Sequence, residues 1–207
     1  CTPTALSTAG VQTVTVNYGG KTATFAVNVQ DVTLSGIAIA SNPTKTSYYV
    51  GDTLDTTGLK LTATYNNGTT QTITSGFTCT PTALSTAGVQ TVTVNYGGKT
   101  ATFAVNVQDV TLSGIAIASN PTKTSYYVGD TLDTTGLKLT ATYNNGTTQT
   151  ITSGFTCTPT ALSTAGVQTV TVNYGGKTAT FAVNVQDVTL SGIAIASNPT
   201  KTSYYVG

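Results

Sequence analysis

Few side chains in this chain could carry chemistry. Histidine, methionine and tryptophan are absent, and charged residues make up 7% of the 207 positions. Cysteine occurs once every 78 residues, as Cys1, Cys79 and Cys157. A cysteine nucleophile needs a neighbouring base to form its thiolate, and no histidine is present to act as one. We interpret Cys79 and Cys157 as buried thiols beside Phe77 and Phe155, with interchain crosslinking as the alternative.

Aspartates are the candidate metal ligands. Ca²⁺ takes six to eight oxygen ligands, and Asp31, Asp52 and Asp55 are spread over 25 positions. Asp52 and Asp55 stand in turn-forming stretches, where bonds to backbone N–H groups explain them equally well. General acid–base catalysis usually requires histidine, glutamate or a cleft with paired aspartates. We therefore expect no catalytic residue, metal or cofactor, and no enzyme activity.

Two tyrosine pairs are candidate contact residues. Tyr48-Tyr49 and Tyr126-Tyr127 each lie in a strand-like stretch, where one ring of a pair points inward and the other outward. Tyrosine is enriched at interfaces, so the outward ring is a candidate contact for a surface glycan or a host ligand.

Charge and apolar runs argue against nucleic-acid binding and a membrane span. Each 78-residue unit holds three lysines and three aspartates, and the net charge of the chain is +1. This leaves no basic face for nucleic acid. No apolar run approaches the roughly 20 residues that span a bilayer, so we expect no membrane span in this window.

One repeat organises the chain. Residues 79–156 repeat residues 1–78 letter for letter, and residues 157–207 repeat the first 51 letters. This period is too long for a helical solenoid and fits one small β-domain per copy.

Apolar and hydroxyl-bearing residues alternate through most of the unit, which predicts strands rather than helices. Gly19-Gly20 and Asn66-Asn67-Gly68 are typical of hairpin turns, and Ser35-Gly36 marks a shift of phase that indicates a β-bulge. About seven short strands per unit favour an immunoglobulin-like β-sandwich. The expected strands cover residues 13–18, 22–29, 32–40, 48–50, 59–65, 70–74 and 77–79.

The strand pattern also sets a domain frame. No Pro/Gly/Ser linker separates Val29 from Val32, which leaves Gln30-Asp31 as the connection. We expect complete domains over 31–108 and 109–186, the C-terminal part of a domain over 1–30, and the N-terminal part of another over 187–207. A window from a longer repetitive protein explains this framing, and strand exchange between chains is the alternative.

In this frame the unit resembles the bacterial immunoglobulin-like (Big) domains of cell-surface proteins. The similar stretches are 50–59 (VGDTLDTTGL), 63–68 (ATYNNG), 87–99 (AGVQTVTVNYGGK) and 103–107 (FAVNV), and they recur within 128–185. The resemblance implies an extracellular sandwich used as a stalk, spacer or adhesin module, without catalytic residues.

These observations predict a non-catalytic structural module on a bacterial cell surface, in which tandem sandwiches form an extended rod, stalk or filament. Neighbouring copies are the expected partners, through lateral or end-to-end assembly. The alternative is a multivalent adhesin or carbohydrate-binding repeat, in which each copy offers a weak site and avidity supplies the affinity.

Overall fold

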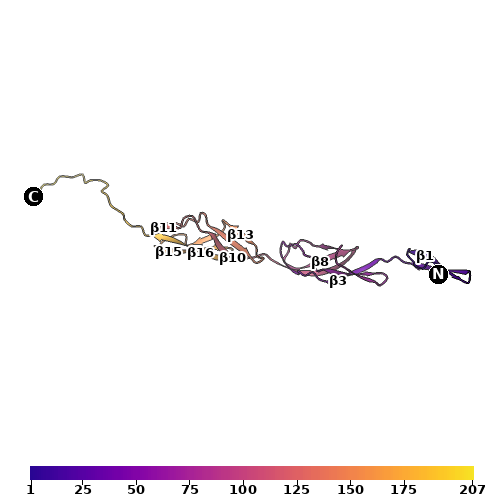
Figure 1. Cartoon of the computed structure of the whole chain (residues 1–207). Helices are drawn as coiled ribbons and strands as arrows, with labels where there is room; N and C mark the ends of the chain where they lie inside the picture. Colours follow the sequence, from indigo (N-terminus) through magenta and orange to yellow (C-terminus); the bar gives the residue numbers. More distant parts are fainter. The chain divides into compact units, whose positions relative to one another are not determined.

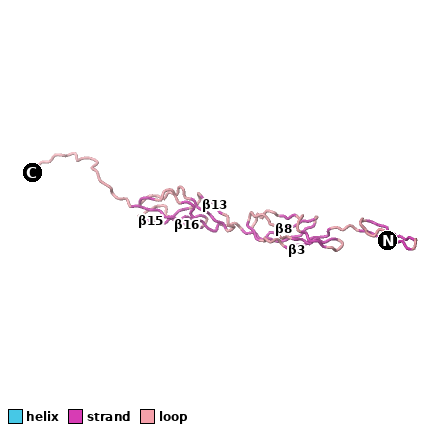
Figure 2. Tube along the Cα trace, in the orientation of Figure 1, coloured by secondary structure: helices cyan, strands magenta, loops and turns pink.

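The computed structural model describes residues 1–207 and contains strands but no helix (Figure 1, Figure 2). None of its elements is therefore a helix with the length and apolarity needed to cross a membrane. The strands of the first part are β1 (Gly10–Tyr18), β2 (Lys21–Val29), β3 (Leu34–Ser41), β4 (Ser47–Tyr49), β5 (Lys60–Tyr65), β6 (Thr70–Ile73), β7 (Thr78–Thr80), β8 (Gly88–Tyr96) and β9 (Lys99–Gln108). Those that follow are β10 (Leu112–Ser119), β11 (Ser125–Tyr127), β12 (Lys138–Tyr143), β13 (Thr148–Ile151), β14 (Thr156–Thr158), β15 (Gly166–Tyr174) and β16 (Lys177–Gln186).

The chain separates into two compact units, over Cys1–Asp109 and Val110–Gly207. In the first unit, seven strands form a three-stranded sheet, β3-β5-β6, and a four-stranded sheet, β4-β9-β8-β7. In the second unit, the same order recurs as β10-β12-β13 and β11-β16-β15-β14. The predicted all-β, immunoglobulin-like sandwich with about seven strands is confirmed.

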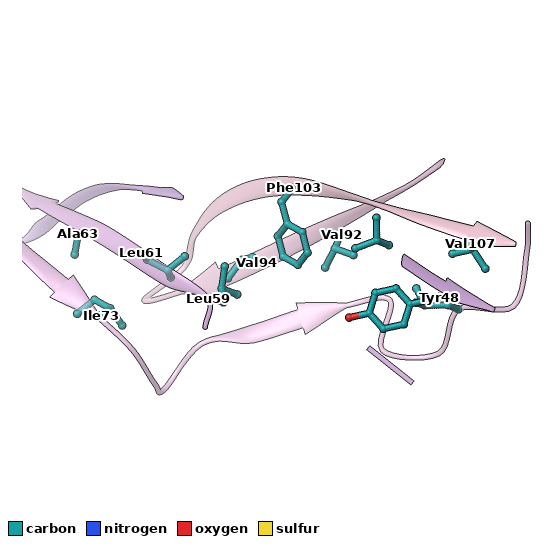
Figure 3. Close-up of a cluster of buried hydrophobic side chains, with 11 residues drawn as sticks. Tyr48, Leu59, Leu61, Ala63, Ile73, Val92, Val94, Phe103 and Val107 are labelled. Atoms are coloured by element: carbon teal, nitrogen blue, oxygen red, sulfur yellow. The ribbon is translucent and has the colours of Figure 1, made fainter. Parts of the chain in front are cut away.

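Each sandwich closes around its own apolar core, because alternate residues of every strand point between the two sheets. Figure 3 shows side chains from β4, β5, β8 and β9 gathered between the strands of the first unit. The core members are Tyr48, Leu59, Leu61, Ala63, Ile73, Leu84, Val92, Val94, Phe103, Val105 and Val107. No polar side chain is buried in either core.

Two predicted irregularities are present. The β8–β9 hairpin turns at Gly97-Gly98, where both residues have positive φ values (56° and 77°) that favour glycine. The register of β3 against β5 shifts between Leu34 and Gly36, which places a bulge at Ser35. The same pairing shifts again between Ile39 and Ser41, and the sequence pattern did not predict this second shift.

A short strand was expected at 48–50, but the pairing of β4 was not. This strand pairs with the end of β9 in a parallel register, with Tyr48 opposite Val107. The other pairings in the sandwich are antiparallel. This pairing fixes the end of β9 to the turn that follows β4, because the Val50 amide donates a hydrogen bond to the Gln108 carbonyl oxygen (2.9 Å).

The two flanking segments contain residues of the same repeat, but these residues lie in a different structural context. Residues 10–29 form only the β1-β2 hairpin, in which Phe25 is 51% exposed; its repeat partner Phe103 is 7% exposed. Residues 187–207 contain no strand, and apolar side chains such as Ile193 and Ile195 are exposed there.

Candidate functional site

The turn after β4 brings together most of the candidate residues of the unit. Asp52 lies in this turn, and its Oδ2 atom accepts a hydrogen bond from the Tyr49 backbone N–H (3.1 Å). The same oxygen lies 3.2 Å from Nζ of Lys45. The backbone bond and then the lysine lower the pKa of Asp52 below its ordinary value. The Asp52 carboxylate therefore stabilises this turn.

The phenol of Tyr48 ties this turn to the loop that follows it. Its ring is buried, with 2% of the residue exposed, and it lies among the core side chains in Figure 3. The O–H donates to the Lys45 carbonyl oxygen (2.9 Å), with the Asp55 carbonyl oxygen at 3.1 Å, and the phenol oxygen accepts the Asp55 N–H (3.1 Å). Lys45 Nζ also lies 4.5 Å from the centroid of the ring.

The tyrosine pairs divide as strand alternation predicts. Tyr48 and Tyr126 were both candidate contact residues, and the structure removes them because their rings belong to the cores. Tyr49 is half-buried and Tyr127 is 54% exposed, so these two remain the outward rings.

Asp55 caps a second turn. Its Oδ1 accepts a hydrogen bond from the Thr57 backbone N–H (2.9 Å), and bonds from Thr57 lower the Asp55 pKa. Asp133 makes the same contact with Thr135 (2.9 Å) in the second unit. Both carboxylates thus act as local turn caps.

The three metal candidates do not form a cluster. Val50, just before Asp52, bonds to the last residue of β9. Asp31 precedes Leu34, whose Cδ2 atom lies close to Gly97 in the turn that opens β9. Asp31 therefore lies at the opposite end of the sandwich from Asp52 and Asp55. The structure has no group of three or more histidine, cysteine, aspartate or glutamate residues that could hold a metal ion.

The two repeat cysteines line the cores from the short strands β7 and β14. Cys79 and Cys157 are free and half-buried rather than fully buried, and they pack against the apolar clusters beside Phe77 and Phe155. Burial raises the pKa of both thiols, which keeps them protonated at neutral pH. This surrounding makes them poor nucleophiles.

Asn66 is a functional candidate that the sequence reasoning missed. Its side chain contacts the segment that enters the sandwich: Nδ2 donates to the Asp31 carbonyl oxygen (2.8 Å), and Oδ1 accepts the Thr33 N–H (3.0 Å). The Asn66 backbone N–H donates to the Thr33 carbonyl oxygen (3.0 Å). The motif gives no local signal for this contact, because Asn66 and Asn67 are the central residues of a turn that the Gly68 N–H closes on the Tyr65 carbonyl oxygen (3.0 Å), and the turn alone explains the Asn-Asn-Gly sequence.

A small hollow opens beside this contact. Its volume is about 50 Å³, far below the hundreds of Å³ that small-molecule sites usually offer. Its lining residues are Gln30, Asp31, Val32, Asn66 and Asn67.

Comparison with known proteins identifies a family match in both units. The sequence profile of the bacterial Ig-like domain (group 3) matches residues 41–107 and again residues 119–185. The two matches together cover more than half of the chain.

Two curated proteins are similar to this chain. Pectate lyase L of Thermoclostridium stercorarium is 31% identical over 197 residues, which are 88% of this chain and 16% of that protein. Exo-beta-1,6-galactobiohydrolase of Bifidobacterium longum is 37% identical over 115 residues, 53% of this chain and 7% of that protein. The chain thus spans less than a fifth of the length of either relative.

Solved structures of surface-layer proteins are also similar. Domains 4 and 5 of the S-layer protein SbsC match at 18% identity and a TM-score of 0.32, covering 73% of this chain and 98% of that one. A longer piece, domains 4–9 of SbsC, matches at 22% identity and a TM-score of 0.30, covering 87% of this chain and 36% of that one.

Proposed function

The chain belongs to the bacterial Ig-like domain family, group 3, and from this premise we propose that it is a non-catalytic structural module of an extracellular or cell-surface protein. Its role is to space apart the regions that carry binding or catalysis. The observation that carries this proposal is that the candidate reactive side chains have structural contacts. Asp52 and Asp55 hold turns, and Cys79 lines the core.

The connection between the sandwiches supports a spacer. The Gln108 carbonyl is bonded to Val50 in the first unit, and the Thr111 N–H is bonded to Asn144 Oδ1 (2.9 Å) in the second. Gln108 and Thr111 are only three positions apart in the sequence. A tether this short has little length over which to flex, so added copies should add length. We propose domain boundaries at Asp31 and Asp109 on the same basis.

The relatives fit an accessory position in a larger protein. Both are named for enzyme activities, and this chain matches only a small share of each. We propose that the matched parts of those proteins are non-catalytic repeats beside a catalytic region. The same placement, in an array of identical units, is the role proposed for this chain.

A length series tests the spacer. Chains of two, four and six sandwiches would be compared by small-angle X-ray scattering. Strand lengths and end loops predict about 35–45 Å of added maximum dimension per sandwich. A dimension that stops growing beyond two sandwiches would overturn the proposal. Sedimentation of the same samples reports any lateral assembly of copies.

A second candidate function rests on the outward tyrosines. Tyr127 is 54% exposed on β11, and Tyr49 occupies the same place on β4. An exposed aromatic ring on each copy suits weak, multivalent binding of a neutral glycan. Binding of the chain to immobilised neutral polysaccharides, lost in the Tyr49→Ala/Tyr127→Ala variant, would support this candidate. Equal retention of parent and variant would reject it.

A further inference from the structure

We propose that Asn66 and Asn144 are positioning residues that stiffen the incoming connection of each sandwich. This inference deepens the proposed spacer role and rests on it. The side chain of the first asparagine in the Asn-Asn-Gly turn forms hydrogen bonds outside its own hairpin, with the segment that enters the same domain.

The contacts of Asn66 form an extra rung on the sheet. Regular pairing of β3 with β5 begins at Leu34, opposite Tyr65. Thr33, one residue earlier, exchanges two hydrogen bonds with Asn66: its N–H donates to Oδ1 (3.0 Å), and its carbonyl accepts the Asn66 N–H (3.0 Å). The side-chain amide therefore replaces a backbone carbonyl in the ladder.

The amide nitrogen of Asn66 extends this hold toward the linker. Nδ2 donates to the Asp31 carbonyl oxygen (2.8 Å). One planar amide thus bonds the backbone on both sides of Val32, which is itself 57% exposed and has little packing to hold it. Hydrogen bonds at two points on a short segment restrict its φ and ψ angles more than burial does here.

The second unit repeats the arrangement. Thr111 donates its N–H to Asn144 Oδ1 (2.9 Å), and the Asn144 N–H donates to the Thr111 carbonyl oxygen (3.0 Å). Val110, the residue before Thr111, is 37% exposed. The connection between the two sandwiches is therefore held by Asn144 at its second end.

The neighbouring asparagine supplies a matched control. Asn145 Oδ1 accepts bonds from the Thr147 N–H (3.0 Å) and the Thr147 hydroxyl (2.7 Å), both within its own turn. Asn144→Ala and Asn145→Ala each delete an amide from the same hairpin. Only the first deletes a bond to the incoming segment.

The local test measures amide hydrogen exchange by NMR in the 207-residue chain, with isotope label restricted to the second unit because the repeats are identical. We expect Asn144→Ala to accelerate exchange of the Thr111 N–H and to leave the core amide of Leu139 unchanged. Asn145→Ala should leave both amides unchanged. An unaltered Thr111 exchange rate in Asn144→Ala would show that Asn144 does not hold the incoming segment, and would overturn the proposal.

The second test measures freedom between the sandwiches. Spin labels at exposed Thr100 and Thr178, in a chain with its cysteines replaced by alanine, report a distance distribution by electron paramagnetic resonance. We expect this distribution to broaden in Asn144→Ala and to match the parent in Asn145→Ala. Equal widths in all three chains would overturn the stiffening role.

Two further comparisons keep the outcomes separate. If Asn144→Ala lowers the thermal midpoint of the second unit, Asn144→Asp replaces it, because that variant keeps the side-chain oxygen that accepts the Thr111 N–H. It should broaden the distribution less than alanine does. A distribution as broad as that of Asn144→Ala would overturn the role of the Thr111 hydrogen bond. The two proposals can also fail separately. If the maximum dimension stops growing in the length series while the Asn144→Ala distribution broadens, the spacer role is rejected and the positioning role of Asn144 stands.

Discussion

The phenol oxygen of Tyr126 accepts a hydrogen bond from the backbone N–H of Asp133 at 3.2 Å. The same hydroxyl donates to the Lys123 carbonyl oxygen (3.0 Å), so one buried side chain joins two turns at the end of the sandwich. Tyr48 does the same in the first unit. Tyr126, which the sequence suggested as a contact residue, therefore holds the loop after β11 by hydrogen bonds.

We expect Tyr126→Phe to destabilise the second unit by about 1–3 kcal/mol. The ring still fills the core, but the Asp133 N–H and the Lys123 carbonyl lose a partner. Tyr127→Phe is the control, because its ring is outward, and it should change stability by less than about 0.5 kcal/mol. Urea unfolding of both variants supplies the measurement. Equal stability of the two would show that the buried hydroxyl contributes nothing.

Much of this fold could be predicted from alternation alone. The two-residue period of apolar side chains located the strands, and the Gly19-Gly20 and Asn66-Asn67-Gly68 turns located the hairpins, since each signal acts over a few residues. The bulge at Ser35 was also readable, because Leu34 and Ile37 fall out of phase in a single strand.

Longer-range features could not be predicted in the same way. The parallel pairing of Tyr48 with Val107 joins positions far apart in the chain, and no local pattern specifies it. Leu84 lies in a loop yet is fully buried, because the loop folds back over the end of the core. The contact of Asn66 with Asp31 spans 35 positions, so its purpose was invisible in the turn motif.

Acid should destabilise the sandwiches through their turn carboxylates. Hydrogen bonds hold the pKa of Asp52, Asp55, Asp130 and Asp133 below the ordinary value of 3.8. A depressed folded-state pKa contributes stability above the unfolded value and loses it as pH falls through the folded value. Stability should therefore hold from pH 7 to about pH 5 and fall below about pH 4.

Urea midpoints measured between pH 7 and pH 2 would show this dependence. The chain with all four aspartates changed to asparagine should be less stable at pH 7, and its midpoint should fall less on acidification. A parent and variant with parallel pH profiles would contradict the assignment to these carboxylates.

The cysteines should separate into two reactivity classes. Cys1 is exposed, whereas Cys79 and Cys157 are half-buried against the cores with raised pKa values. A thiolate-specific reagent such as Ellman's reagent at pH 7.5 should modify one thiol quickly and two slowly. In urea all three should react at similar rates. Rapid modification of all three thiols in the folded chain would contradict burial as the cause.

The exact repetition of the sequence permits a control that few proteins offer. Leu6, Leu84 and Leu162 are the same residue in the same local sequence, yet Leu84 and Leu162 are fully buried and Leu6 is 46% exposed. We expect Leu162→Ala to destabilise the second unit by about 2–5 kcal/mol, because it removes apolar contacts and leaves a cavity. Leu6→Ala should leave the unfolding of both sandwiches unchanged, because Leu6 belongs to neither core. Calorimetry of the two variants measures this contrast. A comparable loss from Leu6→Ala would mean that the identical local sequence, rather than closure of the sandwich around it, sets the contribution of this leucine.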